Sequence, residues 1–204
     1  TVPFGMVQLS PDNGIEGWDW CSGYHYSSKT IAGFSHTHLS GTGVSDYGDI
    51  LVMPTNQIVF NNGADSKKGY RAHFSHENEI AEPGYYRVYL DSTEIDVELT
   101  VSKRSGMHKY QFPLAENQVA IIDLNHRDEV LDANFEVLSN TEIQGYRFSK
   151  AWATDQRLYF SIKTSHTFND LLQSPPEQNA PGGRKIALRF INPNNDPVYI
   201  KIGI

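Results

Sequence analysis

The stretch "EIDVELTV", residues 94–101, alternates acidic or polar side chains with aliphatic ones at every second position. Successive side chains of a β-strand point to opposite faces of the sheet. The pattern therefore places four aliphatic side chains on one face, those of Ile95, Val97, Leu99 and Val101. The acidic residues between them face the other way, toward water. The stretch predicts a half-buried antiparallel strand.

The same period of two recurs on both sides of this stretch. It predicts further strands at 70–75, 84–90, 107–112, 141–149, 157–164, 185–191 and 197–204. Turn signals rich in Gly, Pro and Asn separate these runs. "VAIIDL", residues 119–124, is continuously apolar and predicts a strand covered on both faces. Residues 128–138 are the best candidate for a helix, and their pattern is ambiguous between helix and strand.

The repeated spacing of strand and turn indicates an all-β fold with few or no helices. We expect one large antiparallel β-sandwich, similar to a supersandwich, that occupies residues 1–204 as a single domain. A chain of this length buries on the order of 70% of its unfolded surface, so it needs neither disulfides nor metals for its core.

Composition excludes several kinds of partner. Seventeen basic and 24 acidic residues give a formal charge of −7, which argues against nucleic acid or an anionic membrane. No apolar run approaches the ~20 residues that span a bilayer. Cys21 is the only cysteine, which excludes an intrachain disulfide. The chain begins without Met and stops inside an alternating apolar run, so we expect both ends to be cut from a longer protein.

The first 50 residues have a different composition from the rest. "GWDWCSGYHY", residues 17–26, is rich in aromatic residues, and residues 33–48 show Gly, Ser, Thr and His without a strand-like run. Loops of this length are uncommon inside a domain and are usually functional or disordered. Because aromatic residues argue against disorder, we expect an ordered, functional loop.

Aromatic residues beside short polar ones suggest a sugar site, since an indole ring packs on the C–H face of a pyranose. Trp18 or Trp20 would supply that face. Polar side chains for the hydroxyl rim are Asp19, His36, His38, Ser40, Asp46 and Asp49. An equally good interpretation is that the tryptophans only seal one end of the sandwich.

Other chemistries are open but have weaker support. His36 and His38 lie on one face of an extended segment, and with Asp46 they could bind a transition metal. More often such histidines are hydrogen-bonding residues. Cys21 would be a nucleophile only beside a histidine, and a lone cysteine is usually a packing residue. No pair of carboxylates is singled out by spacing for glycoside hydrolysis.

Five stretches carry a resemblance to a known family. They are "VPFGMVQLSPD" (2–12), "GWDWCSGYHYSSKTIAGFSHTHLSGTGVSDYGDILVMP" (17–54), "PGYYRVYLDSTEIDVELTVSKRSGMHKYQFP" (83–113), "GYRFSKAWATDQRLYFSIKTSHTF" (145–168) and "VYIKIGI" (198–204). Together they cover nearly the whole chain in order. The chain closely resembles the amino-terminal domain of family 92 glycoside hydrolases, which are calcium-dependent exo-acting α-mannosidases.

The resemblance implies a longer two-domain enzyme in which this sandwich packs against an (α/α)6 helical domain that residues 1–204 lack. The active site of such an enzyme lies between the domains and hydrolyses terminal α-linked mannose, with α-1,2 linkage expected, by inversion. The acid, the base and most calcium ligands belong to the helical domain. We therefore expect calcium in the full-length enzyme only, no catalytic or metal-binding residue in this chain, and no activity of the chain alone.

The resemblance further implies that loops of the sandwich line the substrate pocket. We expect Trp18, Asp19, Trp20 and Cys21 to lie near the sugar. Second choices for substrate binding are His36, His38, Ser40 and Asp46. The implied partners are a mannose-containing oligosaccharide or glycan and the helical domain, and the implied location is secreted or periplasmic.

Two alternatives belong to other functional classes. One is a stand-alone, lectin-like carbohydrate-binding module without catalysis, and the other is a structural sandwich with no ligand. If a helical domain normally covers one side, the chain should expose an apolar patch bordered by residues 17–49.

Overall fold

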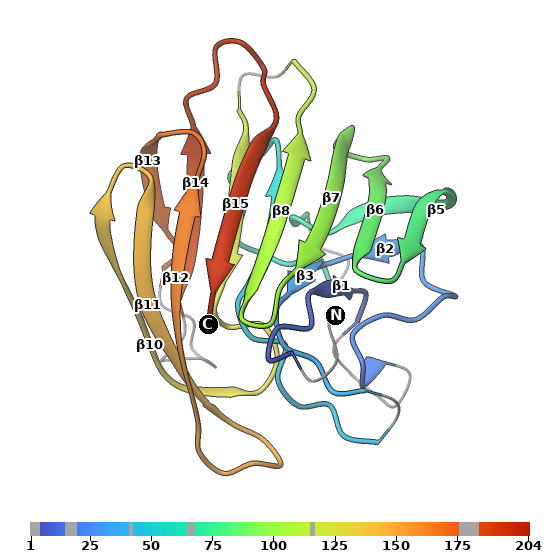
Figure 1. Ribbon diagram of the computed structural model, residues 1–204, viewed down its shortest axis with the longest axis vertical. Coiled ribbons are helices and arrows are strands. Elements are labelled where there is room, and N and C mark those ends of the chain that lie inside the picture. The colour runs from blue at the N-terminus through green and yellow to red at the C-terminus, as the bar shows by residue number, and fades with distance from the viewer. Residues whose placement is uncertain (1–4, 15–19, 41–42, 65–67, 115–116, 176–183) are drawn as a thin grey trace.

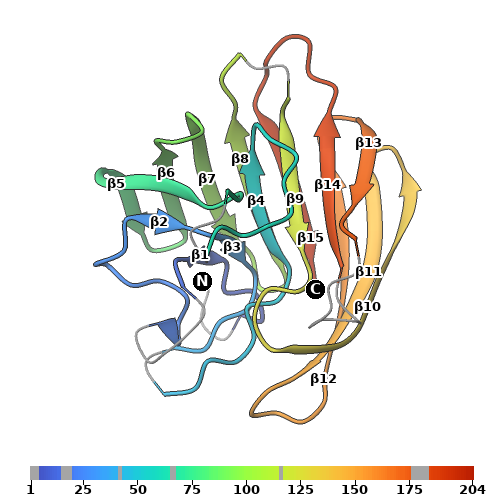
Figure 2. The ribbon, with the colours of Figure 1, turned by 180° about the vertical axis from the view of Figure 1, so that it is seen from behind.

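The computed structural model of the chain describes residues 5–14, 20–40, 43–64, 68–114, 117–175 and 184–204. They form two antiparallel β-sheets packed face to face (Figures 1 and 2). These described residues contain no α-helix, and so no helix long and apolar enough to cross a membrane is found among them. The predicted all-β sandwich is confirmed.

The smaller sheet has six strands. Their spatial order is β1 (Ser10–Asp12), β3 (Gly33–Ser35), β4 (Leu51–Thr55), β9 (Val119–Asp123), β14 (Lys185–Phe190) and β13 (Phe168–Gln173). The larger sheet has nine strands. Their order is β10 (Glu129–Ser139), β11 (Glu142–Lys150), β12 (Gln156–Thr164), β15 (Val198–Gly203), β8 (Ser105–Gln111), β7 (Ile95–Val101), β6 (Tyr85–Leu90), β5 (Ala72–Glu82) and β2 (Thr30–Ile31).

The last strand in sequence is a central strand of the nine-stranded sheet. β15 pairs with β12 on one side and with β8 on the other (Figure 1). It therefore joins two groups of strands that are consecutive in sequence, β10–β12 and β5–β8. The alternating run at the end of the chain is therefore not an edge. Removing it would leave two separate sheets with unpaired backbone groups.

The apolar centre lies around β9. Every residue of β4 and β9 is buried, which confirms the prediction that the run at 119–124 is covered on both faces. The segment that follows β4 passes in front of β4 and β9 in Figure 2, and its residues Val59 and Phe60 pack against the core. The hydroxyl of Tyr70 donates to Asp123 over 2.5 Å and closes this layer.

β7 carries the alternation that predicted the fold. Ile95, Val97 and Leu99 are buried, and Val101 is half-buried at the end of the strand. Of the ambiguous helix candidate 128–138, residues 129–138 lie in strand β10 instead. The register of β10 against β11 shifts between Val130 and Asp132, and again further along. A β-bulge adds a residue and breaks the period of two, which explains the ambiguous pattern.

The prediction for residues 33–48 was partly wrong. Residues 33–35 form the buried strand β3, which pairs with β1 and β4, and His38 forms a bridge with Tyr47 further on. The strand was not predicted because three residues are too few to show an alternation of apolar and polar side chains. The first residue of the strand is glycine, because a Cβ at position 33 would lie only 2.5 Å from the side chain of Leu51.

Candidate functional site

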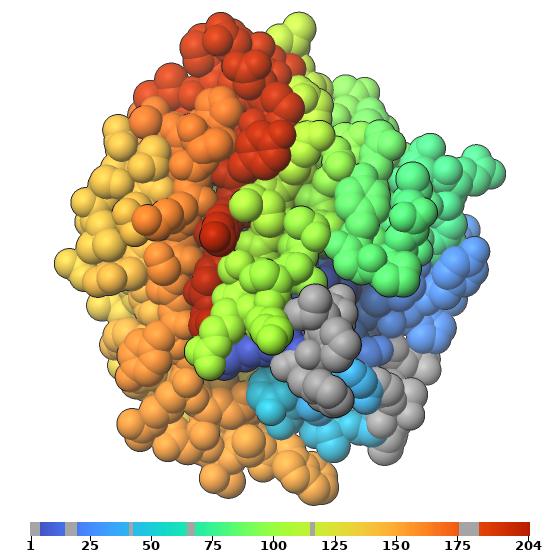
Figure 3. All heavy atoms as spheres, viewed as in Figure 1, coloured from blue at the N-terminus to red at the C-terminus, as the bar shows by residue number. Residues whose placement is uncertain are grey.

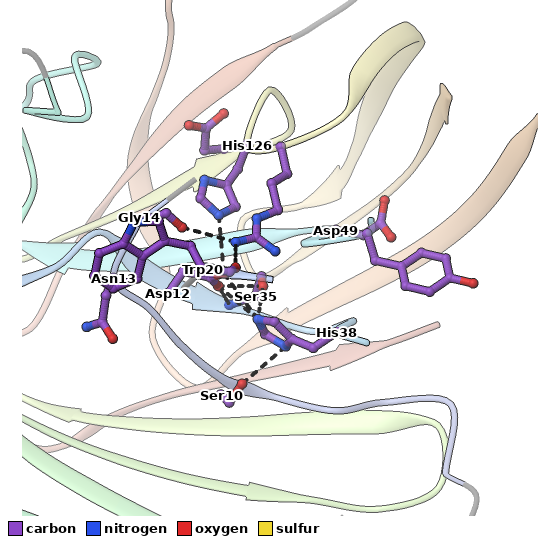
Figure 4. A network of polar contacts seen from close by, with 12 residues as sticks. Ser10, Asp12, Asn13, Gly14, Trp20, Ser35, His38, Asp49 and His126 are labelled. Atoms are coloured by element: carbon purple, nitrogen blue, oxygen red, sulfur yellow. Dashed lines mark hydrogen bonds and ion pairs between the residues drawn. The ribbon is translucent and has the colours of Figure 1, made fainter. Parts of the chain in front are cut away.

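A buried carboxylate organises the amino-terminal segment. Asp12 ends β1 and is fully buried. The hydroxyl of Ser35 on the neighbouring strand donates to it over 2.5 Å. Nε2 of His38 lies 3.1 Å from its Oδ1, and Nε2 of His126 lies 3.4 Å from the same oxygen (Figure 4). Strands β1 and β3 thus meet the β9–β10 loop at one charged group.

The charges of this group are set by its neighbours. Burial alone would raise the pKa of Asp12, but His38 and His126 outweigh burial and hold that pKa well below its usual range. Burial opposes the charged form of His38, yet the attraction of Asp12 leaves the pKa of His38 raised. Nδ1 of His38 donates to the carbonyl of Gln8 over 2.7 Å. Both ring nitrogens of His38 thus face acceptors, a carbonyl and a carboxylate, which is the arrangement of an imidazolium paired with a carboxylate.

Arg127 connects both ends of segment 15–19. Its Nη2 donates to the carbonyl of Gly14 over 3.1 Å and to that of Trp20, while Nη1 donates to the carbonyl of Cys21 over 3.0 Å. Arg127 is buried and has a φ of 55°, a left-handed conformation that costs free energy in a residue other than glycine. Its guanidinium group therefore holds the carbonyls of Gly14, Trp20 and Cys21 close to one another.

The predicted residues of this segment have different surroundings. Trp18 and Asp19 lie outside the described residues. Trp20 is half-buried, and its indole packs over Gly14, where an added Cβ would lie 2.6 Å from the ring. Cys21 is buried, with 2% of its surface exposed. The indole of Trp20 also meets the ring of His25 edge to face, with centroids 5.4 Å apart.

His36 belongs to a second buried network. Its Nδ1 lies 2.7 Å from the carbonyl of Ile50, which can only accept, so Nδ1 carries the proton. Its Nε2 then accepts from Nε2 of His108 over 3.1 Å, and Nδ1 of His108 accepts from the hydroxyl of Tyr110 over 2.7 Å. Each of these ring nitrogens and the hydroxyl thus acts either as donor or as acceptor, and the row of hydrogen bonds links the end of β3 to β8.

The two histidines of this hydrogen-bond network, His36 and His108, are neutral. Burial lowers the pKa of His36 to about 4, and burial together with His36 lowers the pKa of His108 well below its usual value. His36 and His38, two residues apart, therefore differ in charge and in partners. Among the described residues, no three His, Cys, Asp or Glu side chains are placed to hold a metal ion.

Asp46 and Ser40 lie further along the segment. The carboxylate of Asp46 is buried and accepts from the backbone N–H of Trp152 over 3.1 Å and of Ala153 over 3.4 Å. It thereby holds the β11–β12 turn, on which the Trp152 side chain is 79% exposed. Ser40 is exposed.

Asp49 is buried beside them and is fully engaged. The hydroxyl of Thr37 donates to its Oδ2 over 2.6 Å, and Arg147 forms an ion pair with its Oδ1. Asp128 lies nearby and accepts from the N–H of Tyr47 over 2.9 Å. Burial, which outweighs that hydrogen bond and the attraction of Arg147, raises the pKa of Asp128 to about 6.

A hollow of about 490 Å³ lies at this end of the molecule. Its lining includes Thr37, His38, Tyr47 and Asp49 from the amino-terminal segment, and Ala153 with residues 155–158 from the β11–β12 turn and β12. It brings His38 together with a turn more than 100 residues away in sequence. Trp20, Cys21 and His36 do not line it.

Four residues of the site were not predicted from the sequence: Asp12, His126, Arg127 and Arg147. Asp12 stands in "SPDNG", which reads as an ordinary turn. His126 and Arg127 stand one residue beyond the buried run 119–124, so charged residues close to the end of a central strand were the available signal. Arg147 alternates with aromatic residues in β11 and gives no signal.

The whole chain, residues 1–204, matches the family described as Glycosyl hydrolase family 92 N-terminal domain. A protein of Arthroderma benhamiae described as an uncharacterized secreted glycosidase is 29% identical over 118 residues. The aligned part is 55% of this chain and 15% of the fungal protein.

Solved structures give the same picture. The family GH92 α-mannosidase BT3965 from Bacteroides thetaiotaomicron in complex with mannoimidazole is 30% identical, with a TM-score of 0.86 over 100% of this chain and 29% of that one. The family GH92 inverting mannosidase BT2199 from the same organism is 22% identical, with a TM-score of 0.82 over 99% of this chain and 27% of that one, and shows the fold alone. The chain thus spans less than a third of each of these relatives.

Proposed function

Because the chain belongs to glycosyl hydrolase family 92, as its amino-terminal domain, we propose that it is part of an α-mannosidase. The protein would hydrolyse terminal α-linked mannose, α-1,2-linked in its natural substrate, with inversion. Likeness to a mannosidase bound to mannoimidazole, over the whole chain and at 30% identity, supports this proposal. The isolated chain would be inactive.

One observation supports placing the acid and the base outside this chain: three carboxylates that are buried in or beside the amino-terminal segment are already engaged. Asp12, Asp46 and Asp49 each accept hydrogen bonds or ion pairs from protein groups. An inverting hydrolase needs an acid and a base roughly 6.5–9.5 Å apart, both free to exchange protons with substrate and water. We therefore place the acid and the base in the rest of the protein.

The contribution of this chain would be one wall of the mannose pocket. Trp18, Asp19 and Trp20 would contact the sugar, with Cys21 packed behind them. Arg127 would act as a positioning residue, because it holds the carbonyls at both ends of segment 15–19. The polar groups His36, His38 and Asp46 would support this wall from below, and Ser40 would lie at its rim.

The carboxylates of Asp46 and Asp49, as they are placed, are poor candidates for calcium ligands. Calcium takes six to eight oxygen ligands, and the oxygens of Asp46 and Asp49 are directed at N–H and O–H donors instead. We propose that calcium binds to the rest of the protein, and we assign no step to it here. The location would be secreted or periplasmic, in line with the description of the fungal relative as secreted.

The test compares the longer protein that contains this chain with its Trp20→Ala and Arg127→Lys variants on an aryl α-mannoside. Lysine keeps the charge but loses the planar fork that reaches three carbonyls. Misplacing a pocket wall by about 1 Å costs on the order of 10²-fold, so we expect kcat/KM to fall to that extent in both variants. Tyr89→Ala, on an exposed position of β6, is the control and should leave kcat/KM unchanged.

The stereochemistry is followed by NMR, and the first product should be β-mannose. Turnover by residues 1–204 alone would contradict the division of labour. Unchanged kcat/KM in both variants would remove this segment from the pocket.

A further inference from the structure

The outer face of strands β10, β11 and β12 presents an ordered set of side chains. Cross-strand register places nine of them in three rows, Asp132–Phe148–Arg157, Asn134–Tyr146–Tyr159 and Glu136–Gln144–Ser161. The residues between them, such as Ala133 and Leu158, point inward and are buried. We call this face the aromatic grid; strands β10–β12 form the yellow and orange flank in Figure 3.

The rings of the aromatic grid fix one another. Tyr146 stacks on Phe148 with centroids 4.6 Å apart, and Tyr159 meets Phe148 edge to face at 5.6 Å. The guanidinium of Arg157 lies 5.5 Å from the centre of the Phe148 ring, and the hydroxyl of Tyr146 donates to Asp132 over 2.9 Å. A ligand would find these rings already ordered and would lose little affinity to ordering them.

A hollow of about 360 Å³ lies against the rings. Its lining includes Asn134, Glu136, Gln144, Tyr146 and Tyr159. The Tyr159 side chain is 63% exposed at its wall. Within the described part of the chain, neither the Asn134 amide nor the Tyr159 hydroxyl has a hydrogen-bond partner. The hollow therefore combines an aromatic wall with polar groups that have capacity left.

We propose that the hollow of the aromatic grid binds a hexopyranose ring of an oligosaccharide, as a second site apart from the mannose pocket. The C–H face of the sugar would pack on the ring of Tyr159. Its hydroxyls would meet the Asn134 amide, the free oxygen of Glu136 and the carbonyl oxygen of Gln144, whose amide N–H already donates to Glu136 over 2.7 Å. Ligand sites combine apolar walls with a few placed polar groups in this way, and their volumes begin near 300 Å³.

A neutral sugar fits this surface better than a charged or purely apolar ligand. The acidic side chains Asp132 and Glu136 at the edge disfavour an anion. An apolar ligand would leave the Asn134 amide and the Tyr159 hydroxyl covered without partners, which costs free energy. The proposal does not depend on mannosidase activity, because no residue that lines the hollow of the aromatic grid also lines the hollow beside His38.

The test is an NMR titration of the 204-residue chain with methyl α-D-mannopyranoside, with myo-inositol as a polyol that lacks a pyranose ring. We expect saturable shifts of amides in β10–β12 with a Kd of roughly 1 mM for the mannoside, and none for inositol. Tyr159→Ala should weaken binding at least tenfold, whereas Tyr159→Phe should keep most of it because the ring remains. Tyr199→Ala, an exposed tyrosine on β15 outside the hollow, is the matched control.

Because Tyr159 is largely exposed, its replacement should leave the fold intact, which the amide spectrum itself reports. No shifts up to about 50 mM mannoside would overturn the proposal. It would also be overturned by equal affinity in Tyr159→Ala and the unaltered chain, or by shifts confined to residues around Trp20. Loss of binding in Tyr159→Ala with full mannosidase activity in the longer protein would separate this site from the pocket.

Discussion

Two interior regions of this molecule are built on different physical principles. Around β9, the interior is aliphatic, and residues such as Val52, Ile121 and Leu188 are fully buried. Beside the amino-terminal segment, the interior contains Asp49 and Arg147 in an ion pair, with the exposed fraction of each side chain at 4% or less. The first region is stabilised by removing apolar surface from water, and the second depends on hydrogen-bond geometry.

The two regions differ in how well they tolerate amino-acid substitution. Apolar burial is nondirectional, so an aliphatic interior accepts side chains of similar volume at small cost. A buried ion pair is costly to desolvate, and removing one partner leaves the other as an uncompensated charge. The polar region therefore defines one backbone arrangement at the end of the sandwich, where the candidate site lies.

The largest expected effect is on Arg147. It pairs with Asp49 and donates to the carbonyls of Leu124 over 2.8 Å and His126 over 3.0 Å. Arg147→Met should lower the free energy of unfolding by about 3–5 kcal/mol, measured by urea denaturation. Arg87→Met, which breaks an exposed ion pair with Asp96, should cost at most about 1 kcal/mol. An equal loss of unfolding free energy in the two variants would contradict the special role of the buried polar region.

A smaller effect should depend on pH through His108. Its pKa is lowered in the folded protein, so below pH 6.5 only the unfolded chain takes up this proton. The stabilisation contributed by neutral His108 is therefore present above pH 6.5 and is lost as the pH falls. The cost of His108→Gln should be smaller at pH 5 than at pH 7, by about 2 kcal/mol.

Urea denaturation of both proteins at the two pH values measures this difference. His73→Gln, at an exposed position of β5, is the matched control for loss of an imidazole outside the buried network. A cost of His108→Gln that is independent of pH would mean that the buried histidine chain does not exclude the proton.

The smallest effect should occur in the aliphatic region. Ile121 is fully buried in the centre of β9. Ile121→Val removes one methylene and should cost about 0.5–1.5 kcal/mol in urea denaturation, without changing kcat/KM of the longer protein. A cost near that of Arg147→Met would show that the aliphatic region is as demanding as the polar one.

The candidate site was only partly predictable. Aromatic and glycine-rich composition directed attention to the segment that contains Trp20, and the structure places Asp46 and His38 in contact with distant parts of the chain. Composition could not show that Arg127 reaches back over more than 100 residues to the carbonyls of Gly14 and Cys21. Carbonyl oxygens leave no mark in a sequence, so their donors cannot be inferred from it.

The sequence by itself determined the fold class and most strands, because alternation at every second residue is a local property of each strand. It also carried the family, through stretches that follow one another along the chain. Only the tertiary structure decided that the final strand lies between β8 and β12, and that Asp12, His38 and Arg127 meet at one place. Those contacts join segments that are far apart in sequence, and directional hydrogen bonds among them have no period that a sequence could reveal.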